Sequence, residues 1–318
     1  NSSLMDFKDS LPNYNFMKSS INITVVLLLS IANSTSIAQD KKLPIIDVHM
    51  HAYTSKTYYS APDPSGKAGP QTLAEHKQMT LDLMNKHNIV KAVVSQIGGF
   101  ENQEFSGDSR MIQGYYTHEA PTDTSQFKKR IEEGKLKVFG EIGAIYGGNL
   151  LTDQAFAPYL SICERYGIPV MVHTGGGPTG ITYRCCPDFR VSLGDPLLIE
   201  DVLVKYPQLK VCMMHAGEFF HDRALRIMVQ YPQVYADLGV LLWVHDGLNE
   251  YAIQFLKNAK TFGVLDRVLF GSDQMTWPHA IEKSIERLNS YDFLSEEEKR
   301  NIFYHNAVKY LNLDESKL

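Results

Sequence analysis

The stretch IIDVHMH, residues 45–51, places two histidines two positions apart at the end of an apolar run. Alternate side chains of a β-strand share a face, so His49 and His51 can hold one ion between them. Four more metal-binding side chains end later apolar runs in the same way, namely Glu141 in VFGEIG, His173 in PVMVHTG, His215 in VCMMHAG and Asp273 in VLFGSD. If these runs are neighbouring parallel strands, the six side chains converge at one end of the sheet.

Strand-like and helix-like segments alternate from Leu43 onward. The expected strands are 44–50, 90–96, 110–116, 137–142, 169–173, 210–215, 234–238 and 267–270. Helical patterns between them cover 72–86, 124–133, 155–166, 196–205, 222–230 and 249–262, and two more helices close the chain. This alternation predicts an α/β fold, with residues 43–318 as one TIM (β/α)8 barrel. The alternative, an open doubly wound sheet, needs a glycine-rich phosphate loop after the first strand, where this chain has HAYTS.

Local start signals support the expected helices. Asp195 followed by Pro196 is an N-cap with proline at the first helical position, and Ser295 with Glu298 forms a capping box. The net charge of -5 gives no basic stripe, which disfavours nucleic-acid binding through bulk electrostatics. The expected partner is a small-molecule substrate and not a nucleic acid, and a homo-oligomer stays open.

Residues 1–42 differ in composition from the rest and are treated as a leader. Met17 and Lys18 precede a mostly apolar run, and Ser36 and Ala38 occupy the -3 and -1 positions of a cleavage site after Ala38. This order predicts a signal peptide over about residues 17–38, with an apolar run too short to span a bilayer. We expect an exported protein, periplasmic or secreted, without a stable membrane anchor.

The four cysteines are interpreted in the light of export. Cys163 lies in a helical pattern and Cys212 in a strand pattern, and both are expected to be small buried apolar groups. Cys185 and Cys186 are adjacent in a loop. In an oxidising compartment they could form a vicinal disulfide, a bridge to another cysteine, or no bond.

The motifs IIDVHMH, GEIG, VHTGGG, MHAG, GSD and YHNAVKYL resemble the amidohydrolase superfamily, specifically its amidohydrolase-related branch, with features of TatD-like metal hydrolases. The resemblance covers about residues 43–313. It implies that a divalent ion is bound by His49, His51, His173 and Asp273. It also implies that His215 either completes a second metal site or polarises the substrate carbonyl. Glu141 matches the position of a bridging acid in two-metal members, a position at which related decarboxylases usually lack a carboxylate.

Imidazoles and carboxylates suit zinc, which is the default, and also manganese or iron, with one or two ions bound. A divalent ion lowers the pKa of bound water from about 15.7 to about 7, and Asp273 can then move a proton from the attacking water to the leaving group. The expected activity is hydrolysis of an amide, ester or lactone. Two alternatives stay open: a nonoxidative decarboxylase of the same branch, and a catalytically inactive metal-binding protein.

Several residues near the expected centre have structural alternatives. Glu141 could merely hydrogen-bond a loop, and Asp47 is either a partner of a metal ligand or a buried structural group. No role is assigned to Asp237 or His279. The other histidines are expected to be solvated or packing groups: His76, His87, His118, His221, His245 and His305.

Two loops are expected to form the substrate site. The segment GGGPTGITYRCCPDFRVSLGDP, residues 175–196, carries Arg184 and Arg190, whose planar forks suit a substrate carboxylate. Their alternative role is a surface salt bridge or a loop anchor. Residues 52–69 could form the opposite wall.

We predict that mature protein from the native host begins near Gln39, because cleavage after Ala38 removes the leader. Intact-mass measurement or N-terminal sequencing checks this. Cytoplasmic protein that retains Met17 would contradict export.

Overall fold

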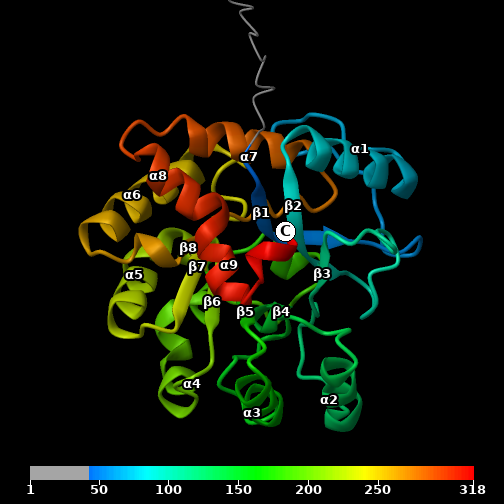
Figure 1. Ribbon diagram of the computed structural model, residues 1–318. Coiled ribbons are helices and arrows are strands. Elements are labelled where there is room, and N and C mark those ends of the chain that lie inside the picture. The colour runs from blue at the N-terminus through cyan, green and yellow to red at the C-terminus, as the bar shows by residue number, and fades with distance from the viewer. Residues whose placement is uncertain (1–42) are drawn as a thin grey trace, which may run out of the picture. The chain divides into compact units, whose positions relative to one another are not determined.

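Parallel strands form the inner wall of the fold, and helices surround them (Figure 1). The structure is a computed structural model that describes residues 43–318, so the expected signal peptide lies outside the described residues. Within this range all the expected strands are present: β1 (Ile45–Ala52), β2 (Ile89–Gln96), β3 (Met111–Gln113), β4 (Phe139–Ile142), β5 (Val170–His173), β6 (Val211–Met214), β7 (Val234–Asp237) and β8 (Val268–Leu269). β3 is shorter than expected, because beyond Gln113 the chain pairs with its neighbour only through isolated bridges.

The strands pair in chain order and close into a barrel. β1, β2 and β3 form one parallel sheet, and β4 to β8 form another. Parallel bridges from Gly114 to Val138 and from Thr117 to Ile142 join the two sheets. On the other side, the Val48 amide donates to the Phe270 carbonyl at 3.0 Å. The α/β TIM-barrel expectation is therefore confirmed.

An α-helix follows each strand except β2, which leads directly to β3, and most of the helices cover the outside of the barrel (Figure 1). They are α1 (Leu73–Lys86), α2 (Thr124–Glu132), α3 (Ala157–Tyr166), α4 (Glu200–Lys205), α5 (His221–Gln230), α6 (Asp246–Thr261), α7 (His279–Asn289), α8 (Glu296–Arg300) and α9 (Asn306–Leu311). The Ser295 and Glu298 capping box is present at α8. The segment expected as one helix over 196–205 begins instead with a 3-10 turn, Pro196–Ile199, capped by Asp195. Among residues 43–318 we find no helix with the length and hydrophobicity of a membrane span.

One end of the barrel interior is filled by apolar side chains. Its buried cluster takes side chains from around the ring of strands and from the closing helical segment: Ile46, Val48, Val93, Val138, Met171, Cys212, Met214, Tyr235, Leu269, Tyr304, Ala307 and Tyr310. The Tyr310 hydroxyl donates to the Val170 carbonyl at 2.9 Å, which fixes α9 against β5. This plug leaves the other end of the barrel for polar side chains.

A bulge in β1 decides which of its residues face the interior. The pairing register with β2 shifts between Asp47 and Met50. Ile46 and Val48 belong to the interior cluster, yet His49 and His51 also point inward, as their contacts with Glu141 show. Even-numbered and odd-numbered residues of one strand can share a face only if an extra residue interrupts the alternation. The bulge therefore brings the two histidines into the barrel above its apolar layer.

The loop after β1 is tied to α7 by a buried carboxylate. Asp63 Oδ2 lies 2.8 Å from His279 Nε2 and 3.2 Å from Lys283 Nζ. Asp63 Oδ1 accepts from the Ser65 and Lys67 amides at 2.8 and 2.9 Å. Burial alone would raise the pKa of Asp63, but hydrogen bonds from Ser65, His279 and Lys67 hold it well below its ordinary value. His279, which had no role from the sequence, thus anchors this loop.

We predict that Asp63→Asn lowers the free energy of unfolding by about 1–3 kcal/mol near neutral pH, because buried partners lose a charged acceptor. A carboxylate with a lowered folded pKa stabilises the fold above its unfolded pKa of about 3.9 and loses that effect as pH falls. The difference in free energy of unfolding between wild type and Asp63→Asn should therefore become smaller at about pH 3. Urea unfolding followed by circular dichroism measures it, and an undiminished gap in acid would contradict the ion-pair explanation.

Candidate metal centre

The six side chains singled out in the sequence meet at the C-terminal end of the barrel. His49 and His51 come from β1, Glu141 from β4 and His173 from β5, while His215 and Asp273 directly follow or lie just beyond β6 and β8. All six are buried, with 2–6% of each residue exposed. His215 and Asp273 adopt φ values of 61° and 47°, in the left-handed region that non-glycine residues rarely occupy. Such local strain persists where the surrounding structure imposes it, often at functional sites.

Glu141 lies between two pairs of histidines. Its Oε2 atom is 3.2 Å from His51 Nε2 and 3.5 Å from His49 Nε2. Its Oε1 atom is 2.7 Å from His173 Nδ1 and 3.9 Å from His215 Nε2. Each pair forms with Glu141 a group whose potential ligand atoms lie within 4.8 Å of one another. One carboxylate thus serves two adjacent sets of imidazoles.

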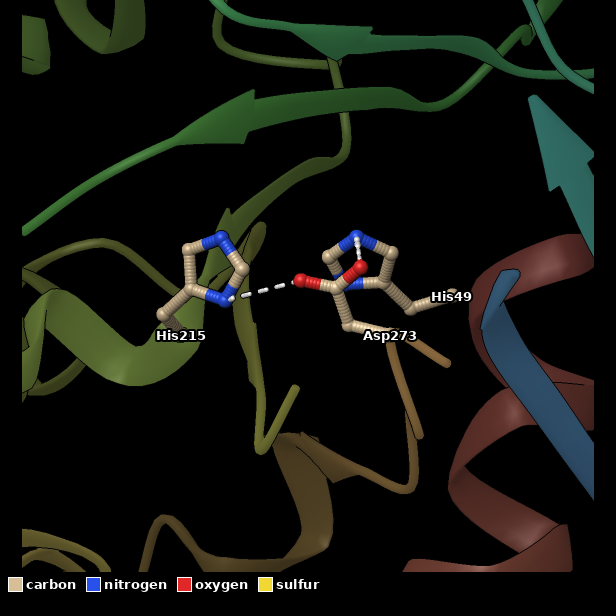
Figure 2. Close-up of side chains that lie close together, drawn as sticks. All are labelled: His49, His215 and Asp273. Carbon is tan, nitrogen blue, oxygen red and sulfur yellow. Dashed lines mark ion pairs between the residues drawn. The ribbon is translucent and has the colours of Figure 1, made fainter. Parts of the chain in front are cut away.

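The Asp273 carboxylate lies between His49 and His215 (Figure 2). Asp273 Oδ1 is 3.1 Å from His51 Nε2 and 3.6 Å from His49 Nε2, and Oδ2 is 4.0 Å from His215 Nδ1. His49, His215 and Asp273 form the third group of side chains able to hold an ion. Asp273 therefore borders both sets of imidazoles.

Each imidazole donates one hydrogen bond away from the centre. The pairs are His49 Nδ1 to Asp237 Oδ2 (3.1 Å), His51 Nδ1 to Ser95 O (3.3 Å), His173 Nε2 to Gly176 O (2.7 Å) and His215 Nδ1 to Gly239 O (3.2 Å). Carbonyl oxygens and ionised carboxylates only accept, so these ring nitrogens carry the protons. In the neutral rings the other nitrogens point their lone pairs at the centre, as in metal-ligating histidines.

The inward-facing atoms require a cation or extra protons. His173 Nδ1 and His215 Nε2 lie 3.1 Å apart, and in neutral rings both would present lone pairs. In the described part of the chain, His49 Nε2 and Asp273 Oδ1 are buried without a hydrogen-bond partner. Divalent metal ions accept both imidazole nitrogen and carboxylate oxygen as ligands. The residues present therefore fit a divalent-metal site.

The charges of the centre are strongly coupled. Burial would raise the pKa of Glu141, but hydrogen bonds from His173 and the other histidines hold it well below its ordinary value. Burial likewise opposes a low pKa at Asp273, and the neighbouring histidines nevertheless lower it to about 2. The same pairing overcomes burial and raises the pKa of His51 to about 9. Neighbouring carboxylates also overcome burial at His49 and His215 and raise their pKa values. Without metal, His49, His51 and His215 therefore take up protons, which a bound cation would displace.

Asp237 and Ser95 support the centre, and no motif had marked them. Asp237 ends β7, orients His49, and accepts from the His215 amide at 3.0 Å. The Ser95 hydroxyl donates to the Gly140 carbonyl at 2.6 Å and accepts from the Glu141 amide at 3.1 Å. The position of Asp237 at the end of an apolar run was a usable signal, whereas Ser95 offered none.

Asp47 acts on backbone rather than on an imidazole. Its Oδ1 atom accepts from the amides of His49 and Ser272, both at 3.0 Å, and so ties β1 to the segment after β8. Burial raises the pKa of Asp47 to about 6 against these hydrogen bonds. Of its two expected roles, the structure supports the buried structural one.

The loop after β5 does not bring its arginines to the six-residue centre. Arg190 Nη1 donates to the carbonyls of Pro187 and Phe189 at 2.8 and 2.7 Å, within its own loop, and Arg184 is exposed. Substrate binding by either arginine stays a prediction. Cys185 and Cys186 form a disulfide in this loop. Cys163 and Cys212 are free and buried, as expected.

Aromatic side chains flank the centre instead. The Tyr116 ring lies edge-on to His51, with 5.8 Å between ring centroids, and the Tyr146 ring lies 5.0 Å from His173. The Tyr116 hydroxyl is 2.7 Å from His118 Nε2, and the His118 ring stacks on Tyr146. The sequence predicts only a packing or solvated role for His118. The structure shows it beside the centre, half-buried in an aromatic wall.

Comparison with solved structures confirms the fold. An uncharacterised TIM-barrel protein from Bordetella bronchiseptica is 18% identical, with a TM-score of 0.64 over 85% of this chain and 99% of the other. A probable 2-pyrone-4,6-dicarboxylic acid hydrolase from Acinetobacter baumannii, with citric acid bound, is 16% identical, with a TM-score of 0.60 over 85% and 100%. At these identities the likeness concerns the fold.

A manganese-containing structure is also similar. A 5-carboxyvanillate decarboxylase from Novosphingobium aromaticivorans, solved with bound manganese and 3-methoxy-4-hydroxy-5-nitrobenzoic acid, is 13% identical, with a TM-score of 0.57 over 86% of this chain and 98% of the other. The fold thus hosts proteins described as hydrolases and proteins described as decarboxylases.

Sequence comparison assigns the family. A search of curated proteins finds no match to this chain. Residues 117–313 match the family model described as Amidohydrolase (Amidohydro_2), which is more than half of the chain and includes four of the six side chains of the centre. The resemblance drawn from the motifs is therefore confirmed, and the chain belongs to the amidohydrolase family.

Proposed function

We propose that this protein is a metal-dependent hydrolase that cleaves the C–N or C–O bond of a small amide, ester or lactone. Membership of the amidohydrolase family supports a metal-dependent enzyme, but its structural neighbours include both hydrolases and decarboxylases. The observation that carries the choice is Glu141, whose two oxygens face two different histidine pairs. This arrangement favours a carboxylate shared by two ions.

The side chains would divide between two ion positions. His49, His51, Asp273 and Glu141 would hold one ion, and His173, His215 and Glu141 would hold the other. This division moves His173 out of the single-ion set that the family resemblance implied. Zinc is the default ion for such ligands, with manganese or iron as alternatives. A divalent ion here supplies a Lewis acid and lowers the pKa of water to about 7.

The protein's own groups would then handle orientation and protons. Asp273 is ionised, because its pKa is lowered to about 2, and can take a proton from the attacking water and pass it to the leaving atom. His215 Nδ1 is engaged by the Gly239 carbonyl, so its Nε2 atom is directed toward Glu141 and His173. This favours ligation by His215 over direct polarisation of the substrate. Tyr116 and Tyr146 would border the substrate.

Two rival functions remain for experiment. The 5-carboxyvanillate decarboxylase that shares this fold holds manganese, so a nonoxidative metal-dependent decarboxylase is the rival enzyme. A catalytically inactive metal-binding protein would more readily lack a ligand, and all six expected side chains are present here. We therefore carry the decarboxylase as the second candidate.

We predict that metal-loaded protein contains about two ions per chain and that Glu141→Ala contains about one, because the variant loses the shared ligand. Elemental analysis after anaerobic loading and desalting gives the ratio. Glu282→Ala, which removes a carboxylate paired with Lys86 away from the centre, should retain two ions. One ion in both wild type and Glu141→Ala would show that Glu141 is not a shared ligand.

Hydrolysis transfers an oxygen atom from water to the product, so turnover in heavy-oxygen water should place label in the carboxylic product. We expect a panel of amides, esters and lactones to contain a substrate that behaves in this way, with activity lost on chelation and restored by zinc. Asp273→Asn should lower kcat by about 10²–10⁴-fold while the protein stays folded. Mass spectrometry of the product decides the reaction. Unlabelled product released with stoichiometric carbon dioxide would make the protein a decarboxylase.

A further inference from the structure

Two segments that each begin with a histidine of the centre interlock beside it. The first runs from His173, the last residue of β5, to Gly176, and the second runs from His215 to Glu218 directly after β6. The Thr174 hydroxyl donates to the Met214 carbonyl at 2.6 Å and accepts from the Gly217 amide at 3.1 Å. The Gly176 amide donates to Glu218 Oε2 at 2.7 Å. The second segment therefore holds the first one at both ends.

Gly176 connects the Glu218 carboxylate to the ring of His173. Gly176 is held at its amide by Glu218, and its carbonyl accepts from His173 Nε2 at 2.7 Å. That hydrogen bond leaves His173 Nδ1 facing Glu141 Oε1 at 2.7 Å. The position of Gly176 thus decides which nitrogen of His173 is presented to the centre.

The backbone is shaped to allow this contact. Glu218 has φ 47° and ψ -119°, and Ala216 has φ 46°, conformations that non-glycine residues rarely adopt. A Cβ on Gly175 would lie 2.7 Å from Glu218 Cγ, and one on Gly176 would lie 2.8 Å from Glu218 Oε2. The missing side chains of the two glycines let the carboxylate reach the backbone. A solvated surface glutamate needs neither feature.

Two simpler roles for Glu218 do not account for these contacts. The contact of Glu218 with the start of α5 is made by its backbone carbonyl, which accepts from the His221 ring at 3.1 Å. Glu218 does not belong to any group of potential metal ligands in residues 43–318. Its carboxylate is engaged by the Gly176 amide.

We propose that Glu218 is a positioning residue for the metal centre, which acts through Gly176 to fix the ring orientation and tautomer of His173. The inference rests on the proposed function in one respect, since His173 is taken as a metal ligand. Loss of the group that orients a ligating histidine commonly weakens metal binding by about 10–100-fold. Glu218 should therefore control affinity for the ion on the His173 side.

The test measures zinc affinity rather than turnover. Full-length protein is loaded with zinc, and zinc is titrated away with a chromophoric chelator to obtain the dissociation constant of each ion. Glu218→Ala should raise the dissociation constant of the ion that His173 holds by about 10–100-fold. The dissociation constant of the other ion should stay near its wild-type value. Glu218→Gln keeps an oxygen that can accept from the Gly176 amide, and it should recover most of the affinity.

A second variant reaches the same contact from the opposite side. Gly176→Ala adds a methyl group that must displace the Glu218 carboxylate, so it should reproduce the loss seen in Glu218→Ala. In a Glu218→Ala background the methyl group has no carboxylate to displace, and the double variant should bind zinc no more weakly than Glu218→Ala alone. Non-additivity of this kind identifies a shared mechanism.

Glu164→Ala serves as the matched control. Glu164 accepts from the Gln208 amide at 2.9 Å, a carboxylate-to-backbone bond of the same kind outside the centre, and its loss should leave zinc affinity unchanged. Thermal unfolding of the metal-free variants verifies that each is folded. Cobalt-loaded wild type and Glu218→Ala should also differ in visible absorption, because the spectrum responds to ligand geometry.

The outcomes separate this inference from the proposed function. Wild-type affinity in both Glu218→Ala and Gly176→Ala would overturn the positioning role. Equal losses in Glu218→Gln and Glu218→Ala would overturn it in favour of a role for the charge itself. If turnover fails to label the product while Glu218→Ala still weakens zinc binding, the hydrolase assignment falls and the positioning role stands. Wild-type protein that binds no zinc would overturn both.

Discussion

The burial of one carboxylate, Glu141, is the constraint on which the metal centre depends. An ionised group removed from water is costly unless partners compensate it. Here the partners are imidazoles from three other strand positions, and they divide between the two oxygens of Glu141. A closed ring of parallel strands delivers side chains from several strand ends to one point. The barrel fold therefore supplies the imidazoles that allow Glu141 to be buried as an ion.

The orientation of the imidazoles follows from a simple rule of donors and acceptors. A neutral imidazole has one N–H, and in each of the four histidines an acceptor outside the centre takes it. The remaining nitrogens must then face inward as lone pairs, close to one another and to two carboxylates. Such a cluster is stable when it holds either added protons or metal. Because a bound metal ion replaces those protons, metal binding is coupled to proton release.

The strands and all six side chains of the centre could be predicted from the sequence, because apolar runs mark buried strands and ligands stand at their ends. The contacts that orient these side chains could not be predicted from the sequence. The β1 bulge reverses the facing of residues within a run that is apolar on both sides, so no alternation reveals it. Asp237 and Glu218 act through partners distant in the chain. Arg190 satisfies its guanidinium with carbonyls of its own loop, which residue type alone does not disclose.

The difference between a hydrolase and a decarboxylase on this barrel can be argued from charge. Glu141 and Asp273 are both buried and ionised, with lowered pKa values. Around a single divalent ion they would already balance its charge, so a substrate carboxylate bound there would be an uncompensated buried anion. With two divalent ions the same carboxylates leave a surplus of positive charge. That surplus would favour the negative charge that develops on a carbonyl oxygen during hydrolysis, which supports the proposed activity.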